Sequence, residues 1–340
     1  MRQARQGSIR RRRGRWQISA LAILSAVAVT VIGCSALNSS GPSAQGGSIA
    51  QGGSIAQGPS LQGQTYTVGS KEFDEQKVLC LLTIAALQAA QAIANDKCGI
   101  VGSVPTRAAL TSGAIDLYWE YTGTAWTAHL KQSNPIPDSQ RQYQAVKEAD
   151  AANNIVWLDP TPFENTYALG VKKETAGRLR VTTLSDFAKL VNSGSPDATL
   201  CVAQEFVGRN DGLPGVEKAY GFRVPTDKLK TLDVGPIYQA VANGNPCNFG
   251  EVFTTDGRIL ALGLTTLTDD KSFFPKFNAA VSLRKDAFDR NPDIAEVLNP
   301  IAAKLTNDVM ITLNKQVSQN GKDPRDVARA WLRQQGFIGT

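Results

Sequence analysis

The chain has 340 residues, of which 42% are hydrophobic and 19% are charged, and its formal net charge is +6. Seven arginines and no acidic residue lie in residues 2–15, so removal of that segment changes the net charge from +6 to −1. The basic charge therefore belongs to the amino terminus, and a nucleic-acid-binding function inferred from net charge fails.

The amino-terminal segment has the pattern of a bacterial export signal. An apolar run over 16–32 follows the arginines; it is too short for a membrane span and is followed by polar sequence. The run ends in the string VIGC at Cys34, which resembles the lipobox of bacterial lipoproteins, where the cysteine takes a diacylglycerol. We expect a signal peptide over 1–33 and a lipidated Cys34, because two or more acyl chains anchor a protein stably. An ordinary signal anchor with an incidental cysteine is the alternative.

Low-complexity sequence follows the cysteine. The string AQGGSI at 44–49 recurs at 50–55 and decays to AQGPS at 56–60. Such Gly, Ser and Gln repeats bury too little apolar surface to offset their chain entropy. We expect 34–64 to be the lipidated cysteine followed by a flexible tether.

About 275 residues remain, enough for two domains of ordinary size. A strand is expected at 66–69 and a helix at 73–94, whose apolar positions share one face. Further strands are expected at 99–104, 115–118, 155–158, 166–171, 200–204 and 249–253. Further helices are expected at 139–153, 184–192, 235–243, 292–305 and 324–335. This alternation predicts an α/β fold with mostly parallel sheet.

Four cysteines remain once Cys34 is lipidated, an even number that suggests disulfides outside the cytoplasm. Cys201 and Cys247 each begin an expected strand, and neighbouring parallel strands that start together bring their α-carbons within bonding range. Pairing of Cys80 with Cys98 is less expected, because a helix to residue 94 leaves Cys80 about 20 Å from the helix end. Four buried free thiols are the alternative. The spacing matches no common zinc site, so no metal is expected.

Five strings in the mature region are distinctive. They are GSKEFDEQ at 69–76, IDLYWEYTGTAW at 115–126, NTYAL at 165–169, RNDGLPG at 209–215 and FTTDGR at 253–258. In this order they resemble the glycine betaine/carnitine/choline-binding proteins of ABC importers, over nearly all of residues 65–340. The resemblance implies a two-lobed periplasmic-binding-protein-like fold of type II, with ligand in the interlobe cleft.

The resemblance also implies that the chain crosses between the lobes twice. We expect lobe 1 at 65–167 plus 275–340 and lobe 2 at 168–274. Closure of the lobes by a hinge motion would bury the ligand and present a surface to the permease.

A trimethylammonium group donates no strong hydrogen bond, so a protein holds it selectively by placing aromatic faces around the cation. The resemblance places this cage on Tyr121, Tyr167, Phe253 and Phe277. The family usually has tyrosine at the last two positions. Phenylalanine keeps the ring face but loses a hydroxyl, which affects ligand affinity and identity.

A carboxylated ligand also needs a cationic partner. The resemblance assigns this role to Lys71, Thr124 and Arg209, and an arginine fork can bind a carboxylate through two parallel hydrogen bonds. Choline has no carboxylate and would leave this cluster unpaired at a cost. The pattern therefore favours betaine-type ligands.

The expected function is that of the extracytoplasmic solute-binding subunit of an ABC importer, lipid-anchored at the cell membrane and without a cofactor. It captures a quaternary-ammonium solute, with glycine betaine favoured, and delivers it to the permease. The alternatives are a binding protein for choline, carnitine or another cationic solute, or a ligand-sensing lipoprotein without transport. No enzyme is expected, because the sequence shows no recognisable nucleophile with a base, metal cluster or phosphate loop. His129 has no nearby Ser or Cys in a nucleophilic arrangement and is interpreted as incidental.

Overall fold

Two five-stranded sheets organise the described residues, 52–132 and 136–339, of the computed structural model. The first sheet has the order β2-β1-β3-β10-β4, and the second has the order β7-β6-β8-β5-β9. The first contains β1 (Thr65–Lys71), β2 (Ile93–Ile100), β3 (Leu117–Tyr121), β4 (Ile155–Trp157) and β10 (Ala279–Arg284). The second contains β5 (Tyr167–Lys172), β6 (Leu200–Val202), β7 (Leu229–Thr231), β8 (Phe249–Phe253) and β9 (Leu264–Thr266).

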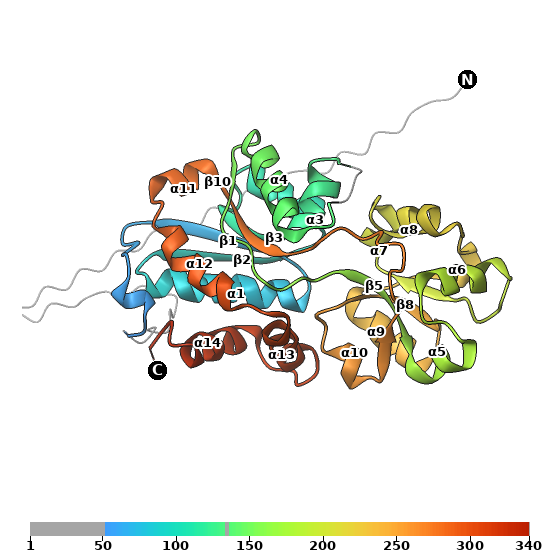
Figure 1. Cartoon of the computed structure of the whole chain (residues 1–340). Helices are drawn as coiled ribbons and strands as arrows, with labels where there is room; N and C mark the ends of the chain where they lie inside the picture. Colours follow the sequence, from blue (N-terminus) through green and yellow to red (C-terminus); the bar gives the residue numbers. More distant parts are fainter. Residues whose placement is uncertain (1–51, 133–135, 340) are drawn as a thin grey trace, which may run out of the picture. The chain divides into compact units, whose positions relative to one another are not determined.

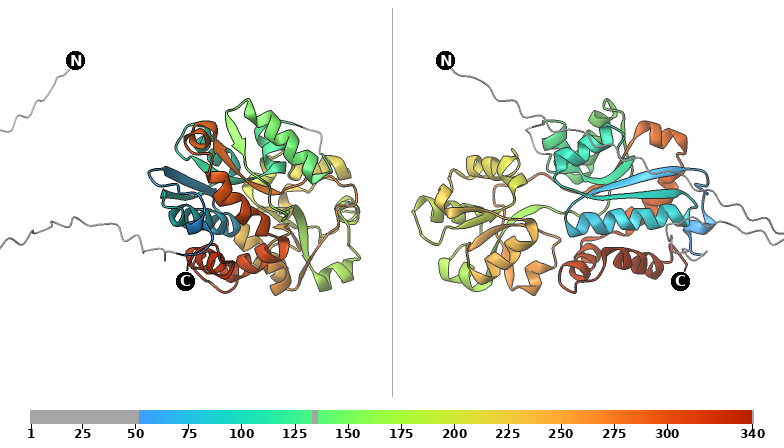
Figure 2. Two further views of the ribbon diagram at one scale, coloured as in Figure 1. Left: turned by 60° about the vertical axis from the view of Figure 1, so that its left-hand side comes forward. Right: turned by 180° about the vertical axis from the view of Figure 1, so that it is seen from behind.

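Helices flank both sheets (Figure 1). Those that follow strands of the first sheet are α1 (Asp74–Ala89), α2 (Ser103–Thr111), α3 (Thr122–Thr124), α4 (Ser139–Ala151), α11 (Lys285–Arg290), α12 (Ile294–Lys304), α13 (Asn307–Ser318) and α14 (Pro324–Gln334). Those that accompany the second sheet are α5 (Lys173–Leu179), α6 (Leu184–Asn192), α7 (Gln204–Gly208), α8 (Leu213–Tyr220), α9 (Val234–Asn243) and α10 (Arg258–Ala261). The views in Figure 2 show the red carboxy-terminal helices beside the blue and cyan elements of the first sheet.

Both sheets are mixed, so the expectation of mostly parallel sheet was wrong. In the first sheet β1 pairs in parallel with β2 and β3, whereas β10 runs antiparallel to both β3 and β4. In the second sheet β6 pairs in parallel with β7 and β8, whereas β5 runs antiparallel to β8 and β9. The antiparallel strands β5 and β10 directly follow the two passages of the chain between the sheets.

The first helix ends earlier than the sequence predicts. It stops at Ala89 rather than at residue 94, and Gln91 adopts a left-handed φ of 72°. The chain then enters β2, which begins at Ile93 and pairs with the start of β1. The strand expected at 99–104 was therefore misplaced. Because β2 is an edge strand with no buried residue, its sequence lacks the apolar alternation that predicts a strand.

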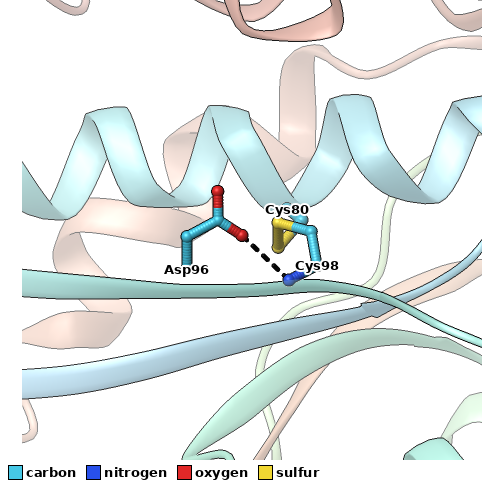
Figure 3. Close-up of side chains that lie close together, drawn as sticks. All are labelled: Cys80, Asp96 and Cys98. Carbon is cyan, nitrogen blue, oxygen red and sulfur yellow. Dashed lines mark hydrogen bonds between the residues drawn. A yellow bond between two sulfur atoms is a disulfide. The ribbon is translucent and has the colours of Figure 1, made fainter.

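Four cysteines form two disulfides. Cys201 lies in β6 and is joined to Cys247, two residues before the neighbouring parallel strand β8, with α-carbons 5.7 Å apart. Cys80 is joined to Cys98, with α-carbons 6.1 Å apart. This second bond forms because β2 starts early and runs back along α1, which carries Cys98 past Cys80 (Figure 3). The predicted helix end at residue 94 had made this pairing less expected.

Removal of the Cys201–Cys247 bond by a double alanine variant should lower the free energy of unfolding by about 4 kcal/mol. The bond closes a loop with a sequence separation of 46, and the entropy lost by the unfolded chain grows with loop length. The matched variant without Cys80–Cys98, with a separation of 18, should lose about 3 kcal/mol. Urea denaturation measures both changes. A larger loss from the shorter loop would contradict the loop-entropy explanation.

Residues 53–64 pack against the body of the protein, in contrast to the flexible tether predicted through residue 64. Ile55 and Leu61 are buried, and their apolar contacts anchor the segment. The prediction of a tether rested on the overall composition and did not take these two side chains into account. The amides of Ser54 and Ile55 donate to the carbonyls of Gly336 and Phe337. A side chain at Gly53 would lie 2.6 Å from the Phe337 carbonyl oxygen, so glycine is required there.

All described residues fall within one compact unit, Ser48–Thr340. None of the described helices is long and apolar enough to cross a lipid bilayer. The predicted signal peptide, Cys34 and most of the repeat sequence lie outside the described residues.

Candidate functional site

A cavity of about 750 Å³ lies between elements of the two sheets. Its wall includes residues of β1, β3 and α2 on one side and of β5, β8 and α9 on the other. The volume is within the range of pockets that bind small molecules. The structure brings all seven predicted ligand-binding residues to this wall: Lys71, Tyr121, Thr124, Tyr167, Arg209, Phe253 and Phe277.

Aromatic rings form one continuous part of the wall. Tyr167 begins β5 directly opposite Phe253 at the end of β8, and their ring centroids are 5.3 Å apart. The ring of Phe277 meets that of Tyr167 edge-on at 5.5 Å. Phe73 stacks on Phe253 at 5.2 Å and on Tyr121 at 6.3 Å. These rings can offer their negative faces together to a cation.

Phe73 is the ring that the sequence analysis did not assign to the cage. It precedes the first turn of α1 and lines the cavity two residues after Lys71. The string GSKEFDEQ could have indicated Phe73 as a ring of the cage, because an aromatic residue lies there among charged residues at a strand-to-helix turn.

Gly123 explains the glycine of the EYTGT string. A Cβ atom at this position would lie 2.7 Å from the ring of Phe277 and 2.8 Å from the carbonyl oxygen of Lys276. The neighbouring Thr122 hydroxyl donates to that same carbonyl at 2.9 Å. Glycine therefore lets the segment just before β10 pack closely enough to bring Phe277 to the cavity.

A buried carboxylate holds Tyr121 in place. Glu75 Oε1 accepts hydrogen bonds from the Tyr121 hydroxyl at 2.7 Å and from Asn165 Nδ2 at 2.8 Å. Its Oε2 accepts from the Thr255 hydroxyl at 2.6 Å and from Asn314 Nδ2 at 2.8 Å. Burial raises the pKa of Glu75, and these hydrogen bonds oppose the rise. The group joins α1 and β3 of the first sheet to the segment after β8 of the second.

Lys71 reaches the cavity already paired with a carboxylate. Its Nζ donates to Glu120 Oε1 at 2.7 Å and lies 4.9 Å from the ring centre of Tyr121. Glu120 Oε2 lies 2.9 Å from Nε2 of His129, which the sequence analysis treated as incidental. Burial favours the neutral form of Glu120, but the charge of Lys71 and the hydrogen bond with His129 outweigh it and lower its pKa.

The guanidinium carbon of Arg209 lies 5.7 Å from the ring centre of Tyr167. Nε and Nη2 both donate to the carboxylate of Asp211, and Nη1 donates to Glu205 at 2.9 Å. Nη2 also lies 3.4 Å from the hydroxyl of Thr124, which places two predicted residues of the carboxylate site in direct contact. Much of the guanidinium edge is therefore occupied by protein carboxylates.

The wall of the cavity also contains acidic residues that the sequence analysis did not single out, among them Glu205 and Glu251. Glu205 pairs with Arg209 and accepts the Ser103 amide at 3.0 Å, so it links α7 to the start of α2. Burial opposes its ionisation, but Lys71 and Arg209 outweigh burial and lower the pKa of Glu205. For Glu251, burial raises the pKa to about 8; the nearby Glu205 adds to this rise and Arg209 opposes it.

Among the described residues, one cluster has the composition of a metal site: Cys80, Asp96 and Cys98. Its two sulfurs are joined in a disulfide, and the Asp96 carboxylate accepts the Cys98 amide at 2.9 Å (Figure 3). The group is therefore a structural cross-link. The wall of the cavity combines several aromatic rings with two cations, Lys71 and Arg209, and this combination suits binding of a ligand with unlike ends.

Comparison with known proteins agrees with this geometry. Residues 64–334 match the family described as the substrate binding domain of ABC-type glycine betaine transport systems. A glycine-betaine-binding protein of Pseudomonas aeruginosa is 35% identical over 282 residues, which cover 82% of this chain and 90% of that protein.

Two solved structures are similar as well. The structure of apo YehZ from Escherichia coli is 31% identical, with a TM-score of 0.59 over 80% of this chain and 99% of that one. A structure described as a glycine betaine/carnitine/choline ABC transporter is 26% identical, with a TM-score of 0.65 over the same shares, 80% and 99%. The predicted two-lobed α/β fold of type II is confirmed.

Proposed function

The chain belongs to the family of substrate-binding domains of ABC-type glycine betaine transport systems, and from this premise we propose how its cavity selects a ligand. The protein binds a quaternary-ammonium solute outside the cytoplasm and delivers it to the permease of an ABC importer. We propose glycine betaine as the preferred solute. The observation that carries this is the meeting of aromatic rings and two cations on the wall of one cavity.

The rings bind the trimethylammonium end. Tyr121, Tyr167, Phe253 and Phe277 take the roles given to them by the sequence, and Phe73 joins them as the ring that links Tyr121 to Phe253. A cation–π contact contributes about 0.5 to 2 kcal/mol, so several rings are needed for useful affinity. The two phenylalanines keep their ring faces and thus their part in the cage.

The cations bind the carboxylate end. Lys71 uses one hydrogen bond for Glu120 and has two further N–H groups to offer. Arg209 is held in position by Asp211 and Glu205, and Thr124 lies beside it. Protein carboxylates already neutralise part of this charge. When choline binds, the cations receive no ligand carboxylate, and this costs less free energy than it would if the cations had no protein partners. We therefore expect a preference for betaine that is real but moderate.

Titration calorimetry of the purified protein tests the proposal. Glycine betaine, proline betaine, carnitine, choline and ectoine are compared at one salt concentration. Glycine betaine should bind saturably, without turnover, and more tightly than choline. Absence of saturable binding for every quaternary-ammonium compound would refute the proposed function, and tighter binding of choline would refute the assigned carboxylate site.

We further propose that the lobes close over this ligand. Lobe 1 spans 65–167 plus 275–340 and lobe 2 spans 168–274, so that the cavity wall is shared between them. The contact of Glu205 with the Ser103 amide supports this proposal, because it already joins the two sides of the cavity.

The remaining part of the proposal is the membrane anchor. The VIGC string supports cleavage after residue 33 and lipidation of Cys34, followed by a linker that ends where Ser54 meets the body of the protein. Cys34→Ala should move the protein from the membrane fraction to the soluble extracytoplasmic fraction and abolish labelling by a radioactive fatty acid. Ser39→Ala is the matched control, since it changes a nearby residue and keeps Cys34 and both disulfides. Unchanged membrane attachment of Cys34→Ala would contradict the anchor.

A further inference from the structure

His129 is a buried residue next to the cavity to which the proposed binding of glycine betaine assigns no role. It is the only histidine of the chain, and it ends η2 (Ala125–His129), a π-helix. Such wide turns are rare, and many of them lie at functional sites. Ala128 lines the cavity, whereas the side chain of the next residue, His129, contacts Glu120. The side chains of His129 and Glu120 are 5% and 0% exposed, so water has little access to this contact.

Four donors fill the acceptor sites of Glu120. Its Oε1 accepts from Lys71 Nζ and from the amide of Tyr121, both at 2.7 Å. Its Oε2 accepts from the hydroxyl of Tyr118 at 2.8 Å and faces Nε2 of His129 at 2.9 Å. An ionised carboxylate accepts about four hydrogen bonds and donates none. His129 therefore supplies the fourth donor, and its Nε2 carries the proton.

The charge of Glu120 controls how much of Lys71 remains for a ligand. Burial opposes ionisation of Glu120, but the charge of Lys71 and the hydrogen bond with His129 outweigh burial and lower its pKa. The carboxylate is therefore anionic. Each donor disperses part of that negative charge, because hydrogen bonds in a buried network polarise one another. The bond from His129 thus weakens the attraction between Glu120 and Lys71.

This weakening matters only to a ligand that carries a carboxylate. Lys71 lines the cavity, and it offers more of its positive charge to a ligand when Glu120 holds it less strongly. Glycine betaine has a carboxylate to receive that charge. Choline has none, and its cation is instead attracted by a Glu120 whose charge is less dispersed. The contribution of His129 therefore appears in the ratio of the two affinities.

We propose that His129 is a positioning residue for ligand selection: it holds Glu120 and disperses its charge, and through Glu120 it sets how strongly Lys71 binds the carboxylate of the solute. His129 acts through Glu120 rather than by touching the ligand. This inference rests on the proposed function and deepens it, because it names a residue that adjusts the preference for carboxylated over uncarboxylated quaternary-ammonium compounds.

Two variants separate the hydrogen bond of His129 from the bulk of its ring. His129→Phe keeps a ring but has no N–H group, whereas His129→Gln keeps an N–H donor. In His129→Phe, calorimetric titration should find that the ratio of glycine betaine affinity to choline affinity falls about threefold to tenfold, part of the effect of one hydrogen bond to a charged group. His129→Gln should restore most of the ratio. General damage to the site cancels in the ratio, so an unchanged ratio in His129→Phe would overturn the inference.

Nuclear magnetic resonance of the untagged wild-type protein tests the same coupling even if His129→Phe fails to fold. Because the chain has one histidine, ¹⁵N-labelled histidine gives imidazole signals from His129 alone. Coupling between two sites is reciprocal. A bound carboxylate that attracts Lys71 should therefore strengthen the bond from His129 to Glu120 and move the Nε2 proton signal downfield. Saturating choline should move it less, and equal shifts with both ligands, or no shift with either, would overturn the inference.

Titration of the wild-type protein with glycine betaine separates this inference from the function on which it rests. Absence of saturable binding would refute the proposed function and the role of His129 with it. Saturable binding together with an unchanged ratio in His129→Phe, or with equal imidazole shifts for both ligands, would refute the role of His129 alone.

Discussion

Glu75→Leu should lower the free energy of unfolding by about 3 to 5 kcal/mol, a large effect for one side chain. Both carboxylate oxygens are shared by four donors, from Tyr121, Asn165, Thr255 and Asn314. Leucine fills a similar volume but accepts no hydrogen bond, so four buried donors lose their partner at once. Replacement of a buried charge is harmless only when its partners are replaced with it, and here they remain.

Ligand binding gives this prediction a second measurement. Since the hydroxyl of Tyr121 is held by Glu75, loss of the carboxylate should also weaken glycine betaine binding through the misplaced ring. Glu75→Gln should have an intermediate effect, because its amide nitrogen faces donors. Glu174→Leu, at an exposed position of α5, should change stability by less than about 0.5 kcal/mol. Urea denaturation that finds Glu75→Leu as stable as this control would contradict the shared-acceptor role.

The parts of the fold with a local signal were predictable from sequence. The helix expected at 184–192 is α6, whose start is marked by a capping box between Thr183 and Asp186. The helix expected at 324–335 is α14, which begins with Asp323 and Pro324 and has one strongly apolar face. In these segments the residues that determine the structure are neighbours along the chain.

Features that depend on distant residues were not predictable. Strand β10 is a short apolar segment, and its antiparallel place between β3 and β4 follows from the path of the chain through the second sheet. The partners of Glu75 are up to 239 positions away in sequence. Glu251 looks like any acid in a strand, and only the fold reveals that it is buried in the wall of the cavity.

The candidate site shows the same division. The family resemblance led to seven residues that the structure places around one cavity. What they did not reveal is that Lys71 and Arg209 are each already paired with an acid, Glu120 and Asp211. This pairing changes the electrostatics of the site, because the two carboxylates partly neutralise the positive charges before a ligand binds.

The two ends of the cavity should respond differently to substitution. Tyr167→Ala removes the ring that contacts Phe253 and Phe277, so binding of glycine betaine and of choline should both weaken by about tenfold to a hundredfold. Tyr167→Phe is the matched control and should bind nearly as the wild-type protein does, since the ring is kept. Calorimetric titration with both ligands measures the change, and undiminished binding in Tyr167→Ala would contradict the cage.

Arg209→Gln should instead change the ratio of the two affinities. The buried Asp211 loses its ion pair in this variant, so some weakening of both ligands is expected from the disturbed loop alone. That structural effect cancels in the ratio of betaine to choline affinity, because both ligands bind the same altered protein. The lost contact with the ligand carboxylate does not cancel, and it should reduce the ratio about tenfold. An unchanged ratio would mean that Arg209 only supports the fold of the site. A ligand with two unlike ends requires that Arg209→Gln reduces the ratio, while Tyr167→Ala weakens both ligands equally.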